Sequence, residues 1–209
     1  MSDNVSTAGR IAASLAHRII SGTLVPNTPL RQDHIAREFN SSHVPVREAF
    51  RQLEAQHLLV SLPRRGVRIA PLDAASIREI AEMRAALEVL ALRHAATKLT
   101  PANLAKIELA LIESDNAETL TEFEAANRAF HQALVAPCGM PRLLASLDGL
   151  QLANSRLVFA TARSSGWRPR SNGDHRLILN ALRMRNVDQA CSLLARHIQT
   201  IERLTVPAA

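Results

Sequence analysis

Positions 41–53 of the chain read Ser41-Ser42-His43-Val44-Pro45-Val46-Arg47-Glu48-Ala49-Phe50-Arg51-Gln52-Leu53. Four apolar residues recur there at helical spacing and predict one buried stripe: Val46, Ala49, Phe50 and Leu53. Ser42 can cap the helix start through its hydroxyl, and Pro45 fits the first turn, where a missing N–H costs little. His43, Arg47 and Arg51 are left to point elsewhere. A short helix with bases outside suits the major groove of DNA, although an amphipathic helix with solvated arginines gives the same pattern.

Two further helices are predicted before this segment. In residues 32–39, Ile35, Ala36 and Phe39 recur at helical spacing, and Asn40 can adopt the left-handed conformation that ends a helix. Residues 11–20 form another amphipathic segment, which stops at Gly22. The succession of helix, tight turn and helix is typical of a helix-turn-helix.

A β-hairpin is predicted directly after the third helix. The runs 57–61 and 67–70 are β-prone, and the turn Pro63-Arg64-Arg65-Gly66 separates them. Such a hairpin is a wing that can lay its two arginines on a phosphate backbone or in a minor groove.

Composition and charge favour a DNA-binding protein of globular type. The 209 residues are 47% hydrophobic and carry a net charge of +6; residues 1–72 hold nine arginines against five acidic residues, an excess that phosphate contacts need. Aromatic content of 3% disfavours a stacking platform for single strands. Cys138 and Cys191 lack metal or redox spacing. Without a signal peptide or an apolar run of about 20 residues, we expect a cytoplasmic protein with no membrane segment.

The domain boundary is predicted at Pro71-Leu72-Asp73, and only helical periodicity follows it. The expected fold is mainly α, with a winged helix-turn-helix of three helices and a small β hairpin in residues 1–72. Residues 73–209 should form an all-α bundle of six helices, at about 74–98, 101–114, 118–136, 140–164, 171–185 and 187–205. Ser164-Ser165-Gly166 and Ser171-Asn172-Gly173 bracket a loop between the fourth and fifth of them.

Three of these bundle helices place a histidine on their apolar face: His131, His175 and His197. Asn127 lies one helical turn before His131 and projects beside it. A lone buried histidine is more often a hydrogen-bonded core residue. Three converging imidazoles and an amide oxygen, however, make a site for a divalent metal ion, with positions left open for a ligand. Imidazole nitrogen favours zinc or nickel, and the amide oxygen leaves room for manganese.

Arg84 interrupts the inward stripe of the first bundle helix. One interpretation is a salt bridge to Glu88, one turn further on. The other is a clamp for the carboxylate of a small effector, because a guanidinium binds a carboxylate through two parallel hydrogen bonds. Asn154, which faces inward in the fourth bundle helix, is a weaker candidate for the same pocket.

The N-terminal motifs resemble the winged helix-turn-helix of GntR-family bacterial transcription regulators, and most closely the FadR branch. The motifs are Gly22-x-Leu24-x-Pro26-x-x-x-Leu30, Ser42-x-x-Pro45-Val46-Arg47-Glu48-Ala49-Phe50-x-x-Leu53 and Pro63-x-x-Gly66-Val67. The resemblance implies DNA contacts in the recognition helix and the wing. The candidate residues are Ser42, His43, Pro45, Arg47, Arg51, Arg64, Arg65 and Gly66. This chain departs from the family at Asp33 and His43, where many relatives carry arginines that tend to touch DNA.

The bundle resembles the FCD ligand-binding domain that follows this winged helix in the FadR branch. The resemblance lies in Met83-Arg84-x-x-Leu87-Glu88, Asn127, Phe130-His131, Asp174-His175-Arg176-x-Ile178-x-x-Ala181-Leu182, Ala190 and Arg196-His197-Ile198. It implies that an Asp or Asn and three histidines hold a divalent ion, and that a small organic acid is sensed beside it. Six helices and a short chain favour the VanR-like subgroup.

Together these features predict a DNA-binding transcription regulator, a repressor and a homodimer, that responds to a small carboxylate and is not an enzyme. Two alternatives stay open: a metal-dependent hydrolase, which an open coordination position would allow, and a regulator whose metal is purely structural. Against the hydrolase, no Glu or Asp has an evident general-base placement beside the histidines, and Asp174 should face away from His175 on a helix.

Overall fold

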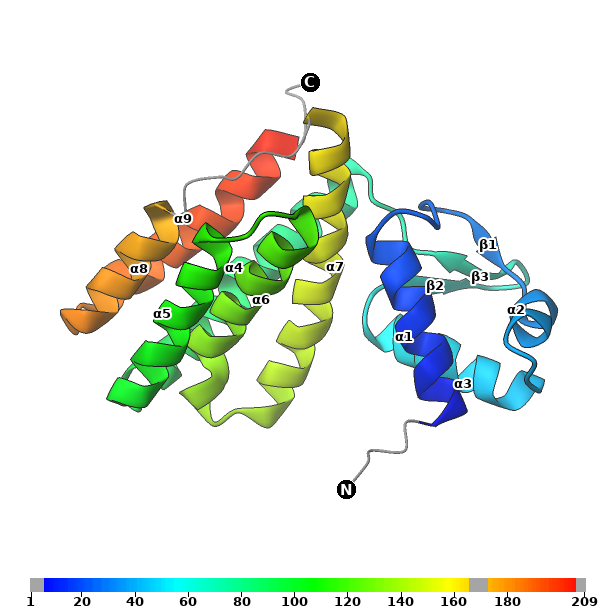
Figure 1. Ribbon diagram of the computed structural model, residues 1–209, viewed down its shortest axis with the longest axis horizontal. Helices are drawn as coiled ribbons and strands as arrows, with labels where there is room; N and C mark the ends of the chain where they lie inside the picture. The colour runs from blue at the N-terminus through cyan, green and yellow to red at the C-terminus, as the bar shows by residue number, and fades with distance from the viewer. Residues whose placement is uncertain (1–5, 166–172, 206–209) are drawn as a thin grey trace. The chain divides into compact units, whose positions relative to one another are not determined.

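The structure of the protein, a computed structural model, describes residues 6–165 and 173–205, and within these the side chains of residues 6–162 and 173–200. The chain divides into two compact units, a winged unit of Met1–Asp73 and a bundle unit of Ala74–Ala209. Figure 1 colours the elements of both units in chain order. The loop predicted after the fourth bundle helix lies outside the described residues.

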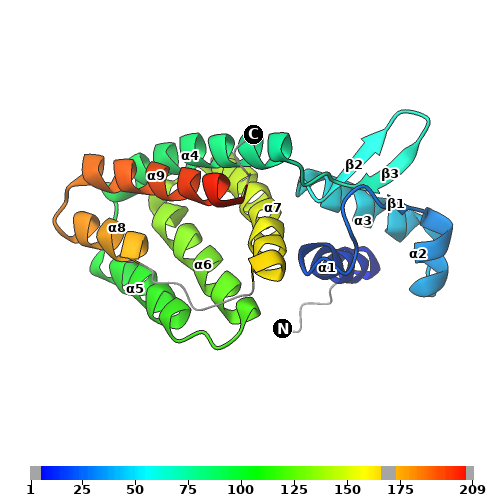
Figure 2. The same cartoon turned by 90° about the horizontal axis from the view of Figure 1, so that it is seen from above.

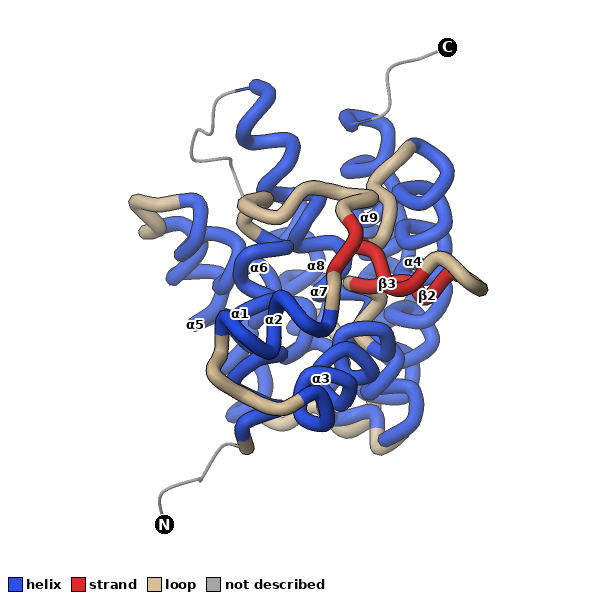
Figure 3. Tube along the Cα trace, turned by 90° about the vertical axis from the view of Figure 1, so that its right-hand side faces the viewer, coloured by secondary structure: helices blue, strands red, loops and turns tan. Residues whose placement is uncertain are grey.

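The winged unit contains three helices and a small sheet. The helices are α1 (Thr7–Ile20), α2 (Gln32–Glu38) and α3 (His43–Ala55). The strands are β1 (Pro29–Leu30), β2 (Leu59–Leu62) and β3 (Gly66–Ile69), paired antiparallel in the order β1-β3-β2. Figure 3 draws β2 and β3 in red beside the helices. The predicted hairpin thus gains a third strand, β1, which is too short to show an alternating pattern in the sequence.

The start of α3 corrects one prediction. Ser42 does occupy the N-cap position with an extended backbone, but its side chain makes no capping hydrogen bond. A capping hydroxyl accepts from the second or third helical N–H. Pro45, the third helical residue, has none, so only the N–H of Val44 is left, and the Ser42 hydroxyl does not accept from it. Asn40 behaves as predicted, with a φ of 46° at the end of α2.

Four residues of α3 form the centre of the winged unit. Val46, Ala49, Phe50 and Leu53 are at most 3% exposed, and α3 packs against α1. Burial of this stripe leaves the opposite face of α3 to its polar side chains, which is the arrangement that the helical spacing predicts.

The described residues of the bundle unit form six α-helices, and with the winged unit they confirm the predicted mainly α fold. They are α4 (Ala74–Ala96), α5 (Pro101–Asp115), α6 (Leu120–Val135), α7 (Pro141–Ser165), α8 (Gly173–Arg183) and α9 (Val187–Thr205), with a short 3-10 turn η1 (Ala136–Cys138). Within the described residues, no helix combines the length and the apolar character of a membrane span.

The long helix α4 is central to the bundle. It packs against α6, α7 and α9, and Figure 2 shows α9 running alongside it. These three helices cover α4 on several sides. Two of its charged side chains, Arg84 and Glu88, therefore lie in the interior, at 1% and 0% exposure.

Candidate metal centre and DNA-contact surface

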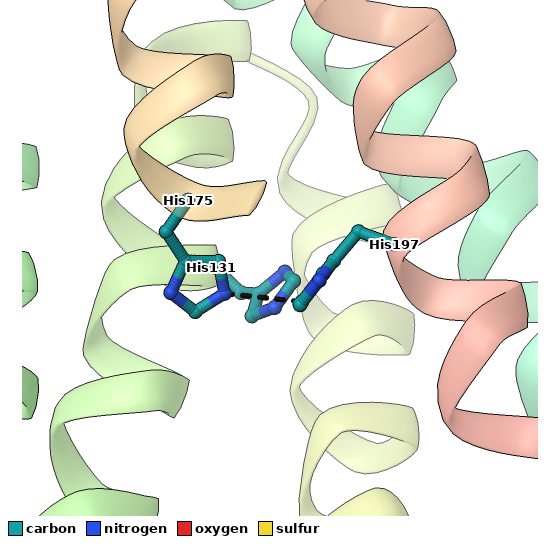
Figure 4. Close-up of side chains that lie close together, drawn as sticks. All are labelled: His131, His175 and His197. Carbon is teal, nitrogen blue, oxygen red and sulfur yellow. Dashed lines mark hydrogen bonds between the residues drawn. The ribbon is translucent and has the colours of Figure 1, made fainter. Parts of the chain in front are cut away.

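Three histidines from three helices meet inside the bundle. His131 comes from α6, His175 from α8 and His197 from α9, and Figure 4 shows their rings converging. One ring nitrogen of each lies within 4.8 Å of the others. The Nε2 atoms of His175 and His197 are 3.0 Å apart. Two nitrogens bound to one zinc ion at about 2.1 Å lie at most about 4.2 Å apart, so this separation fits a shared ion.

Apolar packing holds these rings in the interior. His131 follows the fully buried Phe130 on α6, and the ring of His175 stacks on Phe130 with centroids 4.1 Å apart. His131 and His175 are 1% and 2% exposed, and the side chain of His197 is 14% exposed. The cluster is therefore nearly shielded from water.

A carboxylate fixes the orientation of His131. Its Nδ1 lies 2.7 Å from Oε2 of Glu88, on α4. Since an ionised carboxylate only accepts hydrogen bonds, the proton belongs on Nδ1, and Nε2 keeps a free lone pair. This Nε2 is buried and has no hydrogen-bond partner among the described residues. An imidazole held by a carboxylate, with its other nitrogen free, is the usual arrangement of a metal-binding histidine.

A second carboxylate stands beside His197. Oδ2 of Asp174, at the start of α8, lies 3.3 Å from its Nδ1. Helical spacing predicts that Asp174 faces away from His175, and the carboxylate indeed contacts His197 of the neighbouring helix instead. Helical spacing contains no signal for either contact, because each joins two different helices. Both acids contact ring nitrogens of the cluster, which suits them to orienting imidazoles.

The environment favours the neutral form of His175 and His197. Burial lowers the pKa of His175 far below its usual value, and His197, His131 and Arg84 lower it further. Burial and His131 also lower the pKa of His197, to about 4, although Asp174 acts to raise it. Neutral imidazoles are the form that binds metal ions.

Arg84 forms the salt bridge that one interpretation of the sequence expected. Its Nε and Nη2 lie 2.9 Å and 2.8 Å from Oε1 of Glu88, with both side chains almost fully buried. Burial acts to raise the pKa of Glu88, but Arg84 and His131 outweigh it and lower that pKa to about 2. Gln151 of α7 adds an amide hydrogen bond of 3.4 Å to the same carboxylate. Arg84, Glu88 and His131 thus form one continuous buried chain of contacts.

The two predicted asparagines are also buried. Asn127 on α6 and Asn154 on α7 are each 7% exposed. Asn127 stands one turn before His131, and side chains four apart on a helix share a face. Its amide makes no hydrogen bond to any of the described residues, so it remains available to a ligand of the histidine cluster.

The predicted DNA-contacting residues lie on the surface of the winged unit. Arg47 and Arg51 are exposed on α3, and Arg64 and Arg65 are exposed in the turn between β2 and β3. Gly66 ends this turn with a φ of 75°, a conformation that suits glycine. Of the remaining candidates, Ser42 and His43 are exposed and Pro45 is half-buried.

Asp33 and His43 lie close together. Oδ1 of Asp33 on α2 is 3.5 Å from Nδ1 of His43 at the start of α3. The two positions at which the chain departs from the arginines of many relatives therefore face each other across the helix-turn-helix.

Comparison with known families covers both units. The family described as bacterial regulatory proteins, gntR family, matches residues 7–69, and the FCD domain matches residues 79–200. The FCD match spans the three histidines, Asn127, Arg84 and Glu88.

The chain is similar to transcriptional regulators along most of its length. An HTH-type regulator from the TAR-I ttuE-ttuC' intergenic region of Agrobacterium vitis is 32% identical over 143 residues, 64% of this chain and 84% of the relative. The transcriptional repressor RspR of Escherichia coli K12 is 26% identical over 190 residues, 90% of this chain and 83% of the relative. The solved structure of E. coli McbR/YncC has the same fold, with a TM-score of 0.76, 24% identity and coverage of 94% of this chain and 95% of that one. The Agrobacterium vitis and E. coli K12 relatives are named as a transcriptional regulator and a transcriptional repressor, not as enzymes, so the hydrolase alternative has no support among them.

Proposed function

Because this chain is a transcriptional regulator of the GntR family with an FCD domain, we propose that it is a repressor whose affinity for its operator is set by a small carboxylate. It acts in the cytoplasm as a homodimer on a double-stranded DNA operator. The carboxylate binds beside a divalent ion in the bundle. The six α-helices among the described residues of the bundle favour the VanR-like subgroup. The observation that carries the proposal is the convergence of three histidines in the bundle interior. The Nε2 atom of one of them, His131, is buried and has no partner among the described residues.

The metal ligands are His131, His175, His197 and the amide oxygen of Asn127. Zinc or nickel suits the imidazoles, and manganese suits the oxygen. When bound, such an ion supplies a positive centre that holds an anionic oxygen. Glu88 and Asp174 hold the rings of His131 and His197 in place by their Nδ1 atoms.

Arg84 and Asn154 are the proposed effector contacts from the protein. The guanidinium of Arg84 already binds Oε1 of Glu88. A carboxylate effector therefore has to share the guanidinium with Glu88 or take its place. Arg84 and Glu88 both lie on α4, which starts at the first residue of the bundle unit. An effector that prefers one of two arrangements of this pair shifts the protein towards that arrangement, and operator affinity changes with it.

The DNA contacts come from α3 and the wing. Arg47 and Arg51 reach base edges or phosphates of the major groove, with Ser42, His43 and Pro45 at the entry of the helix. Arg64 and Arg65, positioned by Gly66, hold the phosphate backbone or the minor groove.

The metal site is tested by elemental analysis of protein purified without chelator. The wild type should contain about one divalent ion per chain, and the double variant His131→Ala/His175→Ala should contain none. The matched control is His34→Ala/His94→Ala, since both of these histidines are exposed and lie outside the cluster. Equal metal content in wild type and cluster variant, or none in the wild type after zinc, nickel or manganese is added, would refute the site.

The regulatory step is tested by gel shift on DNA that flanks the gene. Small organic acids should release the DNA from metal-loaded wild type and not from the cluster variant. Metal that is required for folding, with no acid able to change retention, would instead identify a purely structural ion.

A further inference from the structure

We propose that Asn127 makes the metal centre select doubly charged anions, so that the effector is a compact dicarboxylate whose two acidic groups both reach the ion. This inference rests on the proposed metal site and specifies the class of its ligand.

The first step concerns the charge of the coordinating groups. The proposed ligands are three imidazoles, of His131, His175 and His197, and the amide of Asn127. An imidazole binds a metal ion in its neutral form, and an amide has no charge, so every proposed protein ligand is neutral. Three observations support Asn127 as a metal ligand: it is only 7% exposed, it lies one turn before His131, and its side chain has no hydrogen bond to any described residue. A divalent ion in this shell would keep both of its charges.

The second step concerns the charges around the shell. The buried charged side chains that the structure describes are two cations and two anions, namely Arg84, Arg156, Glu88 and Glu124. Arg84 and Glu88 neutralise each other directly, and Glu124 accepts a hydrogen bond from Ser155 of α7. The described part of the bundle interior therefore supplies no net negative charge. Asp174 stands next to His197, but its side chain is 46% exposed and water screens it.

The third step follows from the cost of an unbalanced charge in an apolar interior. A buried ion is stable when opposite charge lies close to it. An aspartate at position 127 would supply one such charge and leave a single charge for the effector to balance. Asn127 supplies no charge, so both positive charges of the ion are left for the effector to balance. At bonding distance in a site without water, Coulomb attraction is strong enough to discriminate between anions of different charge. A dicarboxylate supplies both charges and two oxygen atoms.

The experiment compares two anions of equal size on the full-length, zinc-loaded protein. Malonate and lactate both have three carbons and two oxygen groups that can chelate, but malonate carries two charges and lactate one. Titration calorimetry should show that malonate binds at least about tenfold more tightly than lactate. In Asn127→Asp, zinc should bind more tightly in competition with a chelating dye, and the malonate-to-lactate ratio should fall by about tenfold or more. The matched control is Asn180→Asp, the same change on the exposed face of α8, which should leave both values unchanged.

Each outcome is decisive. An unchanged malonate-to-lactate ratio in zinc-loaded Asn127→Asp, or no preference for malonate in the wild type, overturns this inference while the proposed function survives. Failure of the wild type to bind any divalent ion overturns both. If Asn127→Asp does not fold by circular dichroism, Asn127→Glu, which places the same negative charge one methylene further along the side chain, replaces it in the same comparison.

Discussion

At the scale of single residues, Glu88 connects two buried groups, since Oε1 contacts Arg84 and Oε2 contacts His131. In Glu88→Gln, Arg84 would remain buried without its counter-charge, and unfolding free energy should fall by about 3–5 kcal/mol. His131 would also lose its orienting carboxylate, and metal affinity should drop by about 10- to 100-fold. Urea denaturation and competition with a metal-binding dye measure the two effects. Glu82→Gln, on the exposed face of the same helix, is the control. Wild-type values for both quantities in Glu88→Gln would contradict these roles.

The histidine cluster also sets how stability depends on pH. The folded chain holds the pKa of His197 near 4, whereas an unfolded histidine titrates near about 6.5. As pH falls from about 6.5 towards 4, the unfolded chain takes up a proton that the folded chain does not, so metal-free protein should lose up to about 3 kcal/mol. His175, with its strongly lowered pKa, adds to the loss in the same direction.

Chemical denaturation of metal-free protein at a series of pH values measures this loss. His197→Gln should flatten the pH dependence, whereas His94→Gln, at an exposed position, should leave it unchanged. A pH dependence that is the same in wild type and His197→Gln would show that this ring does not carry the effect.

At the scale of elements, α3 carries the DNA contacts of the winged unit. Arg47→Ala should abolish retention of operator DNA in a gel shift while the circular dichroism spectrum stays unchanged, because Arg47 is exposed and its loss leaves the buried stripe intact. Glu48→Ala, the neighbouring exposed position, removes a negative charge and should not weaken binding. Undiminished retention by Arg47→Ala would disprove the recognition-helix assignment.

The wing should contribute affinity without sequence preference. Arg64 has a φ of 60°, which asparagine tolerates well, so Arg64→Asn/Arg65→Gln removes both charges with little strain. Binding should weaken on all DNA sequences, and the slope of log affinity against log salt should become shallower by about 1.8, because two arginines no longer neutralise phosphates. Fluorescence anisotropy at several salt concentrations provides this slope. A change confined to sequence preference would mean that the wing reads bases.

The sequence predicts those features that depend only on residues close together in the chain. The helices, the buried stripe of α3 and the inward direction of His131 and His175 depend on spacing within one element, and the structure has them as the spacing predicts. The partners of the rings are not predictable in this way, because Glu88 is 43 residues from His131 and meets it only through the packing of α4 on α6. The Ser42 cap is absent although Ser42 occupies the N-cap position: Pro45 removes one of the two N–H groups that a capping hydroxyl can bind, and the hydroxyl makes no bond to the other.

At the scale of the whole molecule, the proposed dimer follows from the small size of the DNA-contact surface. One α3 and one wing cover too little DNA for tight specific binding, and two-fold operators are read by two-fold proteins. Light scattering at working concentration should give twice the chain mass of 22.8 kDa. Tight operator binding by a strict monomer would contradict this prediction.

The contact chain of Arg84, Glu88 and His131 has a consequence for how this sequence can diverge over time. Losing one member of a buried ion pair costs about 3–5 kcal/mol, and a typical domain has about 5–15 kcal/mol of stability in all. A lineage that replaces a single one of these three residues therefore passes through an ancestor that has lost a large share of its stability. In descendants of this gene the three positions should be inherited or replaced together, even though two of them lie 43 positions apart in the chain.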